Sequence, residues 1–387
     1  MKFTILTEEE FKMFTDKALQ QSFFQTINMY HRYQNNGWET YLLGVKKDDK
    51  VIGVALTVSS YSKFGFKIFN IYKGYILDYN NHELVAFFTK NIKSFLKSKK
   101  GIILYIDPNI VSVSRDNEFN ITNDIDNLLV KKYLIDLGYK YIGEYEQVKW
   151  TYVLDLENKS KEEIFKNFRS NHRNLINRAI NKYNVKIKKI DYKDLADFRK
   201  VTSYSANKQG FKDKSLKYYQ DMYKYFDKDV IYLGAYINPL TILNNLNKEL
   251  SNLKEKLNKT NNPNRQKNYE LDITNLEKEI LEVKKLPEKD ILIAASMFML
   301  YGFEVVYLFS GSLDEYQKFG GSYLMQWHII TYALEHGYKR YNFYGIKNDK
   351  NDGVYKFKHG FNGHVEELLG TFALPLNTLG KIYLKIK

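Results

Sequence analysis

Apolar residues between Pro239 and Pro287 recur at alternating intervals of three and four, and this spacing constrains the fold more than any other feature. The positions are Leu243, Leu246, Leu250, Leu253 and Leu257, then Tyr269, Ile273, Leu276, Ile280 and Val283. Such a pattern is typical of the a/d seam of a coiled coil. Pro263 interrupts it within an asparagine-rich turn, which a continuous helix would not tolerate. The segment therefore predicts two antiparallel helices, each about 30 Å long.

The rest of the chain contains one order of elements twice: a β-hairpin, a third strand, a helix and a fourth strand. In the first half these elements are predicted at 41–46, 51–59, 67–72, 82–97 and 102–106. In the second half they are predicted at 230–237, 291–299, 305–309, 322–336 and 340–344. The coiled coil occupies the position of the short hairpin turn of the first half, where a long insertion costs little loop entropy.

This order resembles the core of the acetyltransferase (GNAT) fold, a mixed sheet flanked by helices. We therefore expect an α/β protein with two GNAT-like lobes in tandem and an antiparallel coiled-coil arm inserted in the second. The predicted boundaries are 1–150 for the first lobe, 151–239 with 289–387 for the second, and 240–288 for the arm.

The composition restricts the classes of protein to consider. Of 387 residues, 44% are hydrophobic and 27% charged, and the absence of cysteine excludes disulfides and a cysteine nucleophile. No segment offers the roughly 18 uncharged apolar residues of a membrane-spanning helix. The first residues also lack the basic and apolar order of a signal peptide. The histidines show no metal-ligand spacing and no Walker loop occurs, so we expect a cytosolic protein without a metal or another cofactor.

The chain has a formal net charge of +14. A positive field of this size attracts nucleic acid or an anionic membrane surface. The charge is spread along the chain, so a general preference for lysine at polar positions explains it equally well. Both explanations stay open at this stage.

Two segments could bind phosphate groups. Residues 317–322 approximate the Q-x-x-G-x-G/A loop in which acetyltransferases hold a pyrophosphate, although a plain turn before a helix is an equal alternative. Residues 161–182 predict one helix, which Ser160 and Glu163 begin with a capping box. Its basic side chains are Lys166, Arg169, Arg173, Arg178 and Lys182. They could contact successive phosphates or form a solvated face.

The densest group of aromatic and basic residues lies near the C-terminus. The strand predicted at 340–344 precedes Phe357 and Lys358. Phe357 could form the wall of a pocket, while Lys358 could hold a positive charge beside a developing oxyanion. The alternative is that Lys358 is an ordinary surface lysine.

Together these segments resemble one family, the FemABX non-ribosomal peptidyltransferases of Gram-positive bacteria. The resemblance covers essentially the whole chain and includes 104–108, 173–179, 235–237, 320–327, 340–345 and 357–361. The arm makes the chain most similar to the FemA/FemB branch, because shorter relatives lack this insertion.

The resemblance implies an aminoacyltransferase that moves an amino acid, glycine or serine, from aminoacyl-tRNA to an amine of the peptidoglycan precursor peptide. An aminoacyl ester is already activated, so the reaction requires no cofactor. The implied partners are aminoacyl-tRNA and a lipid-linked precursor, with peripheral contact at the inner face of the membrane. The sequence leaves open whether the protein acts as a monomer, as a homodimer or in a complex with related transferases.

The resemblance also implies roles for individual residues. Lys358, beside Phe357, would stabilise the oxyanion or the tRNA ester, and Asp107 would orient the attacking amine or accept its proton. The implied precursor-binding residues are Phe357, Lys214, Tyr218 and Tyr307, with Lys214 in the place of an arginine. The implied tRNA-binding residues are Arg169, Arg173, Arg178 and, on the arm, Lys254.

Three alternatives remain at this stage. The 317–322 loop also suits a coenzyme A-dependent N-acyltransferase. The protein could instead be an immunity factor that changes bridge composition against a bridge-cleaving endopeptidase, or a binding protein without catalysis. The arm could dock a protein partner rather than tRNA.

Overall fold

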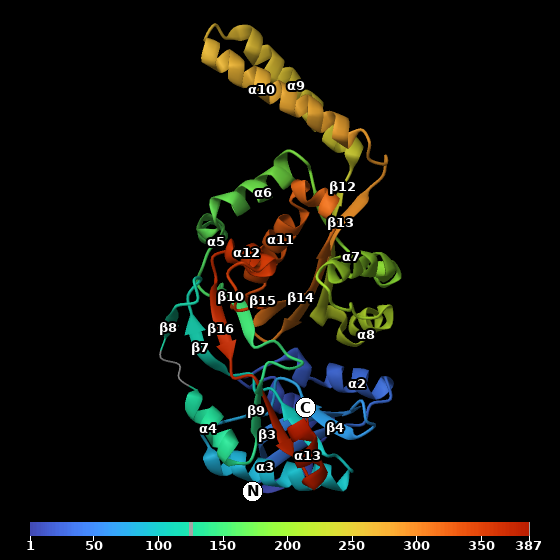
Figure 1. The fold of residues 1–387 in the computed structure, drawn as a ribbon, viewed down its shortest axis with the longest axis vertical. Helices are drawn as coiled ribbons and strands as arrows, with labels where there is room; N and C mark the ends of the chain where they lie inside the picture. The colour runs from blue at the N-terminus through green and yellow to red at the C-terminus, as the bar shows by residue number, and fades with distance from the viewer. Residues whose placement is uncertain (124–126, 387) are drawn as a thin grey trace.

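The chain forms two mixed β-sheets with helices on their faces, and a helical hairpin projects from the second sheet (Figure 1). The computed structural model describes residues 1–123 and 127–386. Both chain termini lie with the first sheet, at the opposite end of the molecule from the hairpin. None of the helices within the described ranges is long and apolar enough to cross a membrane.

The first sheet contains one parallel pair of strands, β4 and β6, among antiparallel neighbours. Its strand order is β1 (Lys2–Ile5), β2 (Thr40–Lys47), β3 (Lys50–Tyr61), β4 (Lys67–Ile71), β6 (Ile103–Ile106), β17 (Thr371–Pro375) and β9 (Lys140–Gly143), with β5 (Ile76–Leu77) beside β3. Helices α3 (His82–Ser98) and α4 (Leu128–Asp136) cover one face. The other face carries α1 (Glu8–Thr15), α2 (Ile27–Asn35) and α13 (Thr378–Ile386).

The second sheet repeats this arrangement, with β14 and β15 as its parallel pair. Its strand order is β11 (Lys186–Lys189), β12 (Val230–Ile237), β13 (Ile291–Tyr301), β14 (Glu304–Ser312), β15 (Arg340–Gly345), β10 (Trp150–Asp155), β16 (His364–Leu368), β7 (Val111–Arg115) and β8 (Ile121–Asn123). One face carries α5 (Lys161–Asn167), α6 (Ser170–Asn181), α11 (Gly321–Glu335) and α12 (Gly353–His359). The other face carries α7 (Leu195–Lys208) and α8 (Leu216–Phe226).

The repeated order predicted from the sequence is confirmed. All ten predicted elements are present, and their ends agree within three residues. The order β2–β3–β4–β6 in one sheet matches β12–β13–β14–β15 in the other, and a helix connects each parallel pair. The fold is therefore α/β with two related mixed sheets.

The two halves of the chain exchange strands, which the sequence did not predict. β7 and β8 follow β6 in the chain but lie in the second sheet, beside β16. β17 and α13 follow β16 but belong to the first sheet. The predicted boundaries need correction at these segments, because hydrophobic alternation identifies a strand but not the sheet in which it pairs. The division of the chain into lobes otherwise stays a prediction.

An apolar core joins the lobes directly. It contains Phe11 and Met29 from α1 and α2 together with Phe198 and Tyr219 from α7 and α8. Since all four side chains are almost completely buried, separating the lobes would expose them to water.

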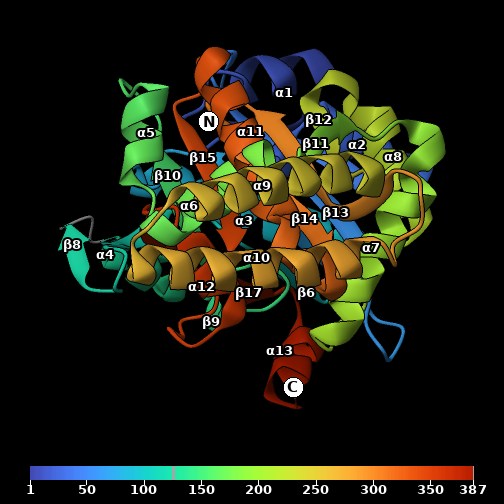
Figure 2. The same cartoon turned by 90° about the horizontal axis from the view of Figure 1, so that it is seen from above.

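Two helices, α9 (Pro239–Lys259) and α10 (Pro263–Val283), form the projecting hairpin and lie side by side in both views (Figures 1 and 2). Each helix begins with proline, and Asn238 and Asn262 cap their first turns. At the base of the hairpin, Leu246 and Leu276 are buried in the core of the second lobe. These two positions of the predicted seam therefore anchor the hairpin to the lobe.

Candidate active site

The parallel strands of the second sheet, β14 and β15, separate near Lys358, one of the predicted site residues. β14 and β15 pair only from Glu304 with Arg340 to Val306 with Asn342, although both strands continue. β14 remains paired with β13 and contains a bulge next to Tyr307, while β15 remains paired with β10. Beyond Val306 the two strands are joined to their outer neighbours but not to each other, which leaves a gap in the sheet.

Lys358 occupies this gap. Its Nζ donates a hydrogen bond of 2.6 Å to the carbonyl oxygen of Gly345, at the end of β15, and lies 5.9 Å from the ring centre of Tyr307 on β14. The residue is only 4% exposed, so it is not a surface lysine. Burial lowers the pKa of its amine to about 7, and Asp352 opposes this shift only in part. Lys358 can therefore be either protonated or neutral near neutral pH.

Helix α12 carries Phe357 and Lys358 and is fixed from two sides. Asp352 caps its first turn by accepting hydrogen bonds from the N–H groups of Val354 and Tyr355. Nε2 of His172 donates to the carbonyl oxygen of Phe357 at 2.8 Å, since a carbonyl oxygen can only accept. Burial lowers the pKa of this ring. The Asp352 cap at its start and the contact from His172 on α6 therefore fix the position of α12, and with it the position of Lys358.

The ring of His172 packs so closely on the end of α12 that the next position must be glycine. A Cβ on Gly360 would lie 1.9 Å from this ring. The ring of Phe357 is half-buried, 5.1 Å from the ring of Tyr323.

The turn between β7 and β8 also contacts α12, although it comes from the first half of the chain. Glu118 accepts a hydrogen bond from Nε2 of His359 at 2.9 Å, and Arg169 approaches the same nitrogen at 2.8 Å. Phe119 stacks on Tyr355 with ring centres 4.8 Å apart. The sequence did not point to this turn, because nothing in its composition shows that it crosses to the other sheet.

Asp107 follows β6, at the end of the parallel pair of the first sheet. It is 6% exposed, accepts a hydrogen bond from the hydroxyl of Thr371, and donates its own N–H to the carbonyl oxygen of Ile71 at 3.2 Å. Burial raises the pKa of its carboxyl group, which nearby Lys73 partly offsets. Within residues 1–123 and 127–386, no hydrogen bond or ion pair joins Asp107 to Lys358.

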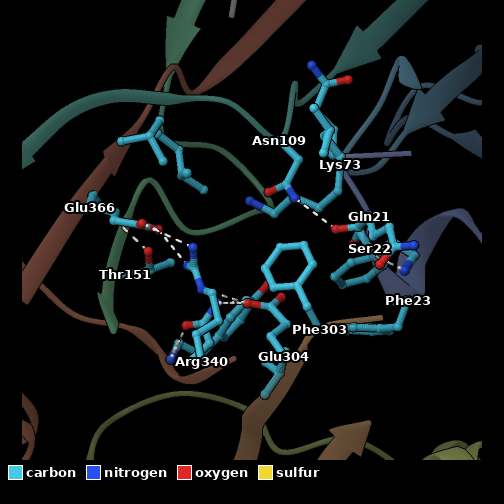
Figure 3. A pocket seen from close by; sticks show the side chains of 18 residues that line it. Gln21, Ser22, Phe23, Lys73, Asn109, Thr151, Phe303, Glu304, Arg340 and Glu366 are labelled. Atoms are coloured by element: carbon cyan, nitrogen blue, oxygen red, sulfur yellow. Dashed lines mark hydrogen bonds and ion pairs between the residues drawn. The ribbon is translucent and has the colours of Figure 1, made fainter. Parts of the chain in front are cut away.

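A polar cavity of about 180 Å³ lies between the sheets (Figure 3). Arg340 binds Glu366 in a bidentate pair, at 2.7 and 3.2 Å, and its Nε lies 3.3 Å from Glu304. Lys73 lines the same cavity and is 5% exposed; burial lowers the pKa of its amine, and Asp107 and Glu304 partly offset this. The sequence analysis missed this cluster, although charged residues within apolar strands were a signal that could have found it.

The bulge in β14 directs neighbouring aromatic rings to opposite faces. Tyr307 packs in the core of the second lobe, whereas Phe309 packs in the core shared by the lobes. Lys214 and Tyr218 lie on the Phe309 side, with Lys214 Nζ 5.5 Å from the Tyr218 ring centre. The candidate precursor-binding residues are therefore divided between two faces of one strand.

Arg32 on α2 joins the Lys214 and Tyr218 group from the first lobe. Its guanidinium carbon lies 4.3 Å over the Tyr218 ring, in a cation–π contact. An arginine is therefore present beside the position at which the sequence has lysine, although the sequence analysis did not select it. Burial raises the pKa of Tyr218, so its hydroxyl stays protonated.

The single helix predicted at 161–182 is wrong. The backbone leaves helical geometry at Phe168, with φ −61° and ψ 147°, and α5 and α6 are separate helices. The cause is tertiary: Phe168 is buried against Phe361, and the N–H of Arg169 donates to the carbonyl oxygen of Gly360. The predicted capping box of Ser160 and Glu163 is confirmed at the start of α5.

The basic residues predicted to form a row are divided among α5, α6 and the residues beside these helices. Each of the arginines also has a partner within the protein. Arg173 donates to the carbonyl oxygen of Lys166 at 2.6 Å, and Arg178 donates to the hydroxyl of Tyr183 at 2.6 Å. On the arm, Lys254 pairs with Glu277 at 2.9 Å. Binding of tRNA by these residues stays a prediction, in which phosphates would have to compete with internal partners.

The glycine loop before α11 is shaped by packing. Gly320 has φ +72°, and a Cβ there would lie 2.8 Å from the carbonyl oxygen of Leu175 on α6. A Cβ on Gly321 would lie 2.7 Å from the side chain of Ile293. Helix α6 therefore crosses the start of α11, where an acetyltransferase would hold its pyrophosphate.

Two related sheets of this kind define a class, the tandem acetyltransferase-like fold. A solved tandem GNAT protein from the clavulanic acid biosynthesis pathway superposes with a TM-score of 0.51 at 6% identity, covering 97% of this chain and 98% of that one. The solved structure of FemX superposes with a TM-score of 0.76 at 22% identity, covering both chains completely. These likenesses establish the fold.

Sequence similarity then defines the family. The model of the FemAB family matches residues 6–384. The aminoacyltransferase FemA of Staphylococcus aureus, in strains MRSA252 and N315, is 32% identical over 97% of this chain and 96% of its own length. The chain belongs to the FemAB family.

Proposed function

We propose that this protein transfers a glycyl or seryl group from aminoacyl-tRNA to an amine of the peptidoglycan precursor peptide, and so builds the interpeptide bridge. Its similarity to aminoacyltransferase FemA over nearly the full length supports the class of reaction. The observation that carries the proposal is the buried Lys358 in the gap between β14 and β15. A cation in such a gap can stabilise an oxyanion without competition from water.

The chemistry is the attack of an amine on an ester. The neutral amine of the acceptor forms a bond to the carbonyl carbon of the aminoacyl group, the carbonyl oxygen becomes an oxyanion, and the ribose oxygen of the tRNA leaves. Protonated Lys358 would exchange its bond to Gly345 for a hydrogen bond to that oxyanion. The proton lost by the amine balances the one gained by the ribose oxygen. Phe357, next to the gap, would exclude water from it.

Asp107 would orient the attacking amine or accept its proton. Its raised pKa makes it a better base than an exposed aspartate. In this proposal the two substrates would meet between Asp107 and Lys358. Tyr307, Lys214 and Tyr218 would then bind the precursor, and the guanidinium of Arg32 adds a planar phosphate-binding group beside Tyr218.

The donor tRNA would contact the arm and α6. We infer that α9 and α10 pack as a coiled coil, which the seam spacing supports. Arg169, Arg173, Arg178 and Lys254 would bind tRNA phosphates by exchanging their internal partners. The same surface could instead dock a related transferase. A lipid-linked acceptor would require peripheral contact with the inner face of the membrane.

Two alternatives are separable by experiment. The packing of Gly320 against Leu175 disfavours a coenzyme A-dependent acyltransferase, because the carbonyl oxygen of Leu175 lies against the 317–322 loop where it enters α11. Tight binding of acetyl-coenzyme A by calorimetry would reverse this conclusion. An immunity role is distinguished by comparing bridge composition by mass spectrometry with and without the gene.

The direct test incubates the purified protein with glycyl- or seryl-tRNA and a lipid-linked precursor and follows labelled amino acid. We expect label in the precursor peptide. Absence of transfer with either amino acid, on precursors of every bridge length, would contradict the proposal.

A further inference from the structure

Helix α13 exposes several large apolar side chains. Gly380 and Leu384 are buried and attach the helix to the first sheet. Leu379, Ile382 and Ile386 are 41%, 50% and 77% exposed. Their spacing of three and four places them in one stripe along the helix, away from the buried positions.

The stripe continues onto the turn between β3 and β4. Phe64, at this turn, is 72% exposed, and its ring centre lies 6.4 Å from that of Tyr383 on α13. We call Leu379, Ile382, Ile386, Tyr383 and Phe64 the α13 patch. Contiguous exposed apolar surface of this kind is typical of a binding site.

The two segments that form the α13 patch carry charged side chains of one sign. Lys381 and Lys385 are exposed on the same helix, and Lys63 is exposed beside Phe64. The chain contains no Asp or Glu after Glu367, and none between residues 50 and 77. A partner that covers this patch therefore meets apolar groups flanked by cations without neighbouring carboxylates from either segment.

We propose that the α13 patch is a membrane-docking surface that inserts into the interface of an anionic lipid bilayer. An exposed amphipathic helix with lysines beside its apolar stripe is the arrangement that binds such interfaces. Lysine stems can extend along the apolar region while the ammonium groups reach lipid phosphates. The α13 patch lies on a projecting helix rather than in a groove, so it fits a lipid surface better than a protein segment.

The position of the patch agrees with its proposed partner. In Figure 1, α13 and the arm lie toward opposite ends of the long axis, and in Figure 2 α13 stands out from the body of the molecule. Docking through α13 would leave the arm at the far end of the molecule from the docked helix. This inference deepens the proposed function, since it assigns the surface that brings the enzyme to a lipid-linked acceptor.

The test measures sedimentation of the full chain with vesicles of phosphatidylcholine, with or without 30% (mole fraction) phosphatidylglycerol. We expect binding that requires the anionic lipid and weakens with salt. The triple variant Leu379→Ser, Ile382→Ser, Ile386→Ser should bind about tenfold more weakly or worse. The matched control is Leu271→Ser with Leu281→Ser, two leucines of similar exposure on the arm, 60% and 59%.

A second pair of variants tests charge. Lys381→Glu with Lys385→Glu should reduce binding, whereas Lys278→Glu on α10 with Lys284→Glu directly after it should not. Wild-type binding by the triple α13 variant, or no binding of the wild-type chain to anionic vesicles, would overturn the inference. The transferase assay with a water-soluble precursor is independent of vesicles, so its failure would contradict the proposed function and leave the docking result intact.

Discussion

The two sheets contain the same parallel pair of strands, but the pair ends differently in each. In the first sheet, β4 and β6 pair along four positions, and the backbone of Asp107 continues this pairing to Ile71. In the second sheet, pairing stops after three positions, and the amine of Lys358 occupies the space between the strands. The same arrangement of strands therefore places a buried carboxylate at the end of the pair in the first sheet, and a buried amine in the gap of the pair in the second sheet.

In the proposed reaction, this difference would give the two sheets different roles, one supplying a carboxylate and the other a cation. A closed pair leaves a side chain at the strand end, where Asp107 lies near the charge of Lys73. An open pair makes room for a side chain from elsewhere, here from α12. The comparison predicts that the open pair carries the larger share of transition-state stabilisation.

The largest expected effect is at Lys358. Lys358→Met removes the cation while keeping the side-chain length, and we expect kcat/KM for transfer to fall about 1,000-fold because the oxyanion loses its donor. Lys356→Met, an exposed lysine of the same helix, should retain activity. Similar rates for both variants would remove Lys358 from the mechanism.

Asp107 should contribute less. Asp107→Asn keeps the shape and the bond from Thr371 but cannot accept a proton, so we expect kcat to fall about 100-fold. Asp136→Asn, an exposed residue on α4, serves as the control. If Asp107→Asn reduces transfer more than Lys358→Met does, the roles assigned to the two sheets are reversed.

The contact of Glu118 with α12 should have a smaller effect. Glu118→Gln weakens the charge-assisted bond to His359, and we expect kcat to fall about fivefold through a less fixed Lys358, with the melting temperature unchanged. The control is Glu9→Gln, an exposed glutamate of α1. An unchanged kcat would show that the turn between β7 and β8 is not needed to hold α12.

A separate prediction concerns stability rather than catalysis. Burial holds the pKa of Lys358 at about 7, below its ordinary value of 10.5. Between these values the unfolded chain binds more protons, so the free energy of unfolding rises with pH. From pH 7 to 9, the wild type should gain about 2 kcal/mol relative to Lys358→Met in urea denaturation. Parallel pH dependences of the two proteins would show that Lys358 is not buried as a neutral amine.

Much of the architecture could be predicted from local pattern. The two helices of the arm, the repeated element order and the Ser160 capping box depend on residues close in sequence, and all three features correspond to elements of the structure. The break at Phe168 could not be predicted, since residues 161–182 have helical spacing throughout. It results from contacts with Phe361 and Gly360, nearly 200 residues away.

The candidate site could be predicted only where it depends on residues close in sequence. The sequence places Phe357 and Lys358 after a strand that ends in the second sheet, and the structure brings Lys358 to that strand's end. It did not show Arg32 over Tyr218, or the pair of Arg340 with Glu366, because each joins distant segments.

The sequence by itself determined the elements, their order and the identity of the basic and acidic groups available for chemistry. Hydrophobic spacing and turn residues act within one or two turns of chain, so they specify each element locally. Only the tertiary structure decided that β17 and β7 exchange sheets, that β14 and β15 open after three pairs, and that a lysine fills the opening. Those outcomes depend on which apolar faces bury one another across the whole chain, a choice that no short segment encodes.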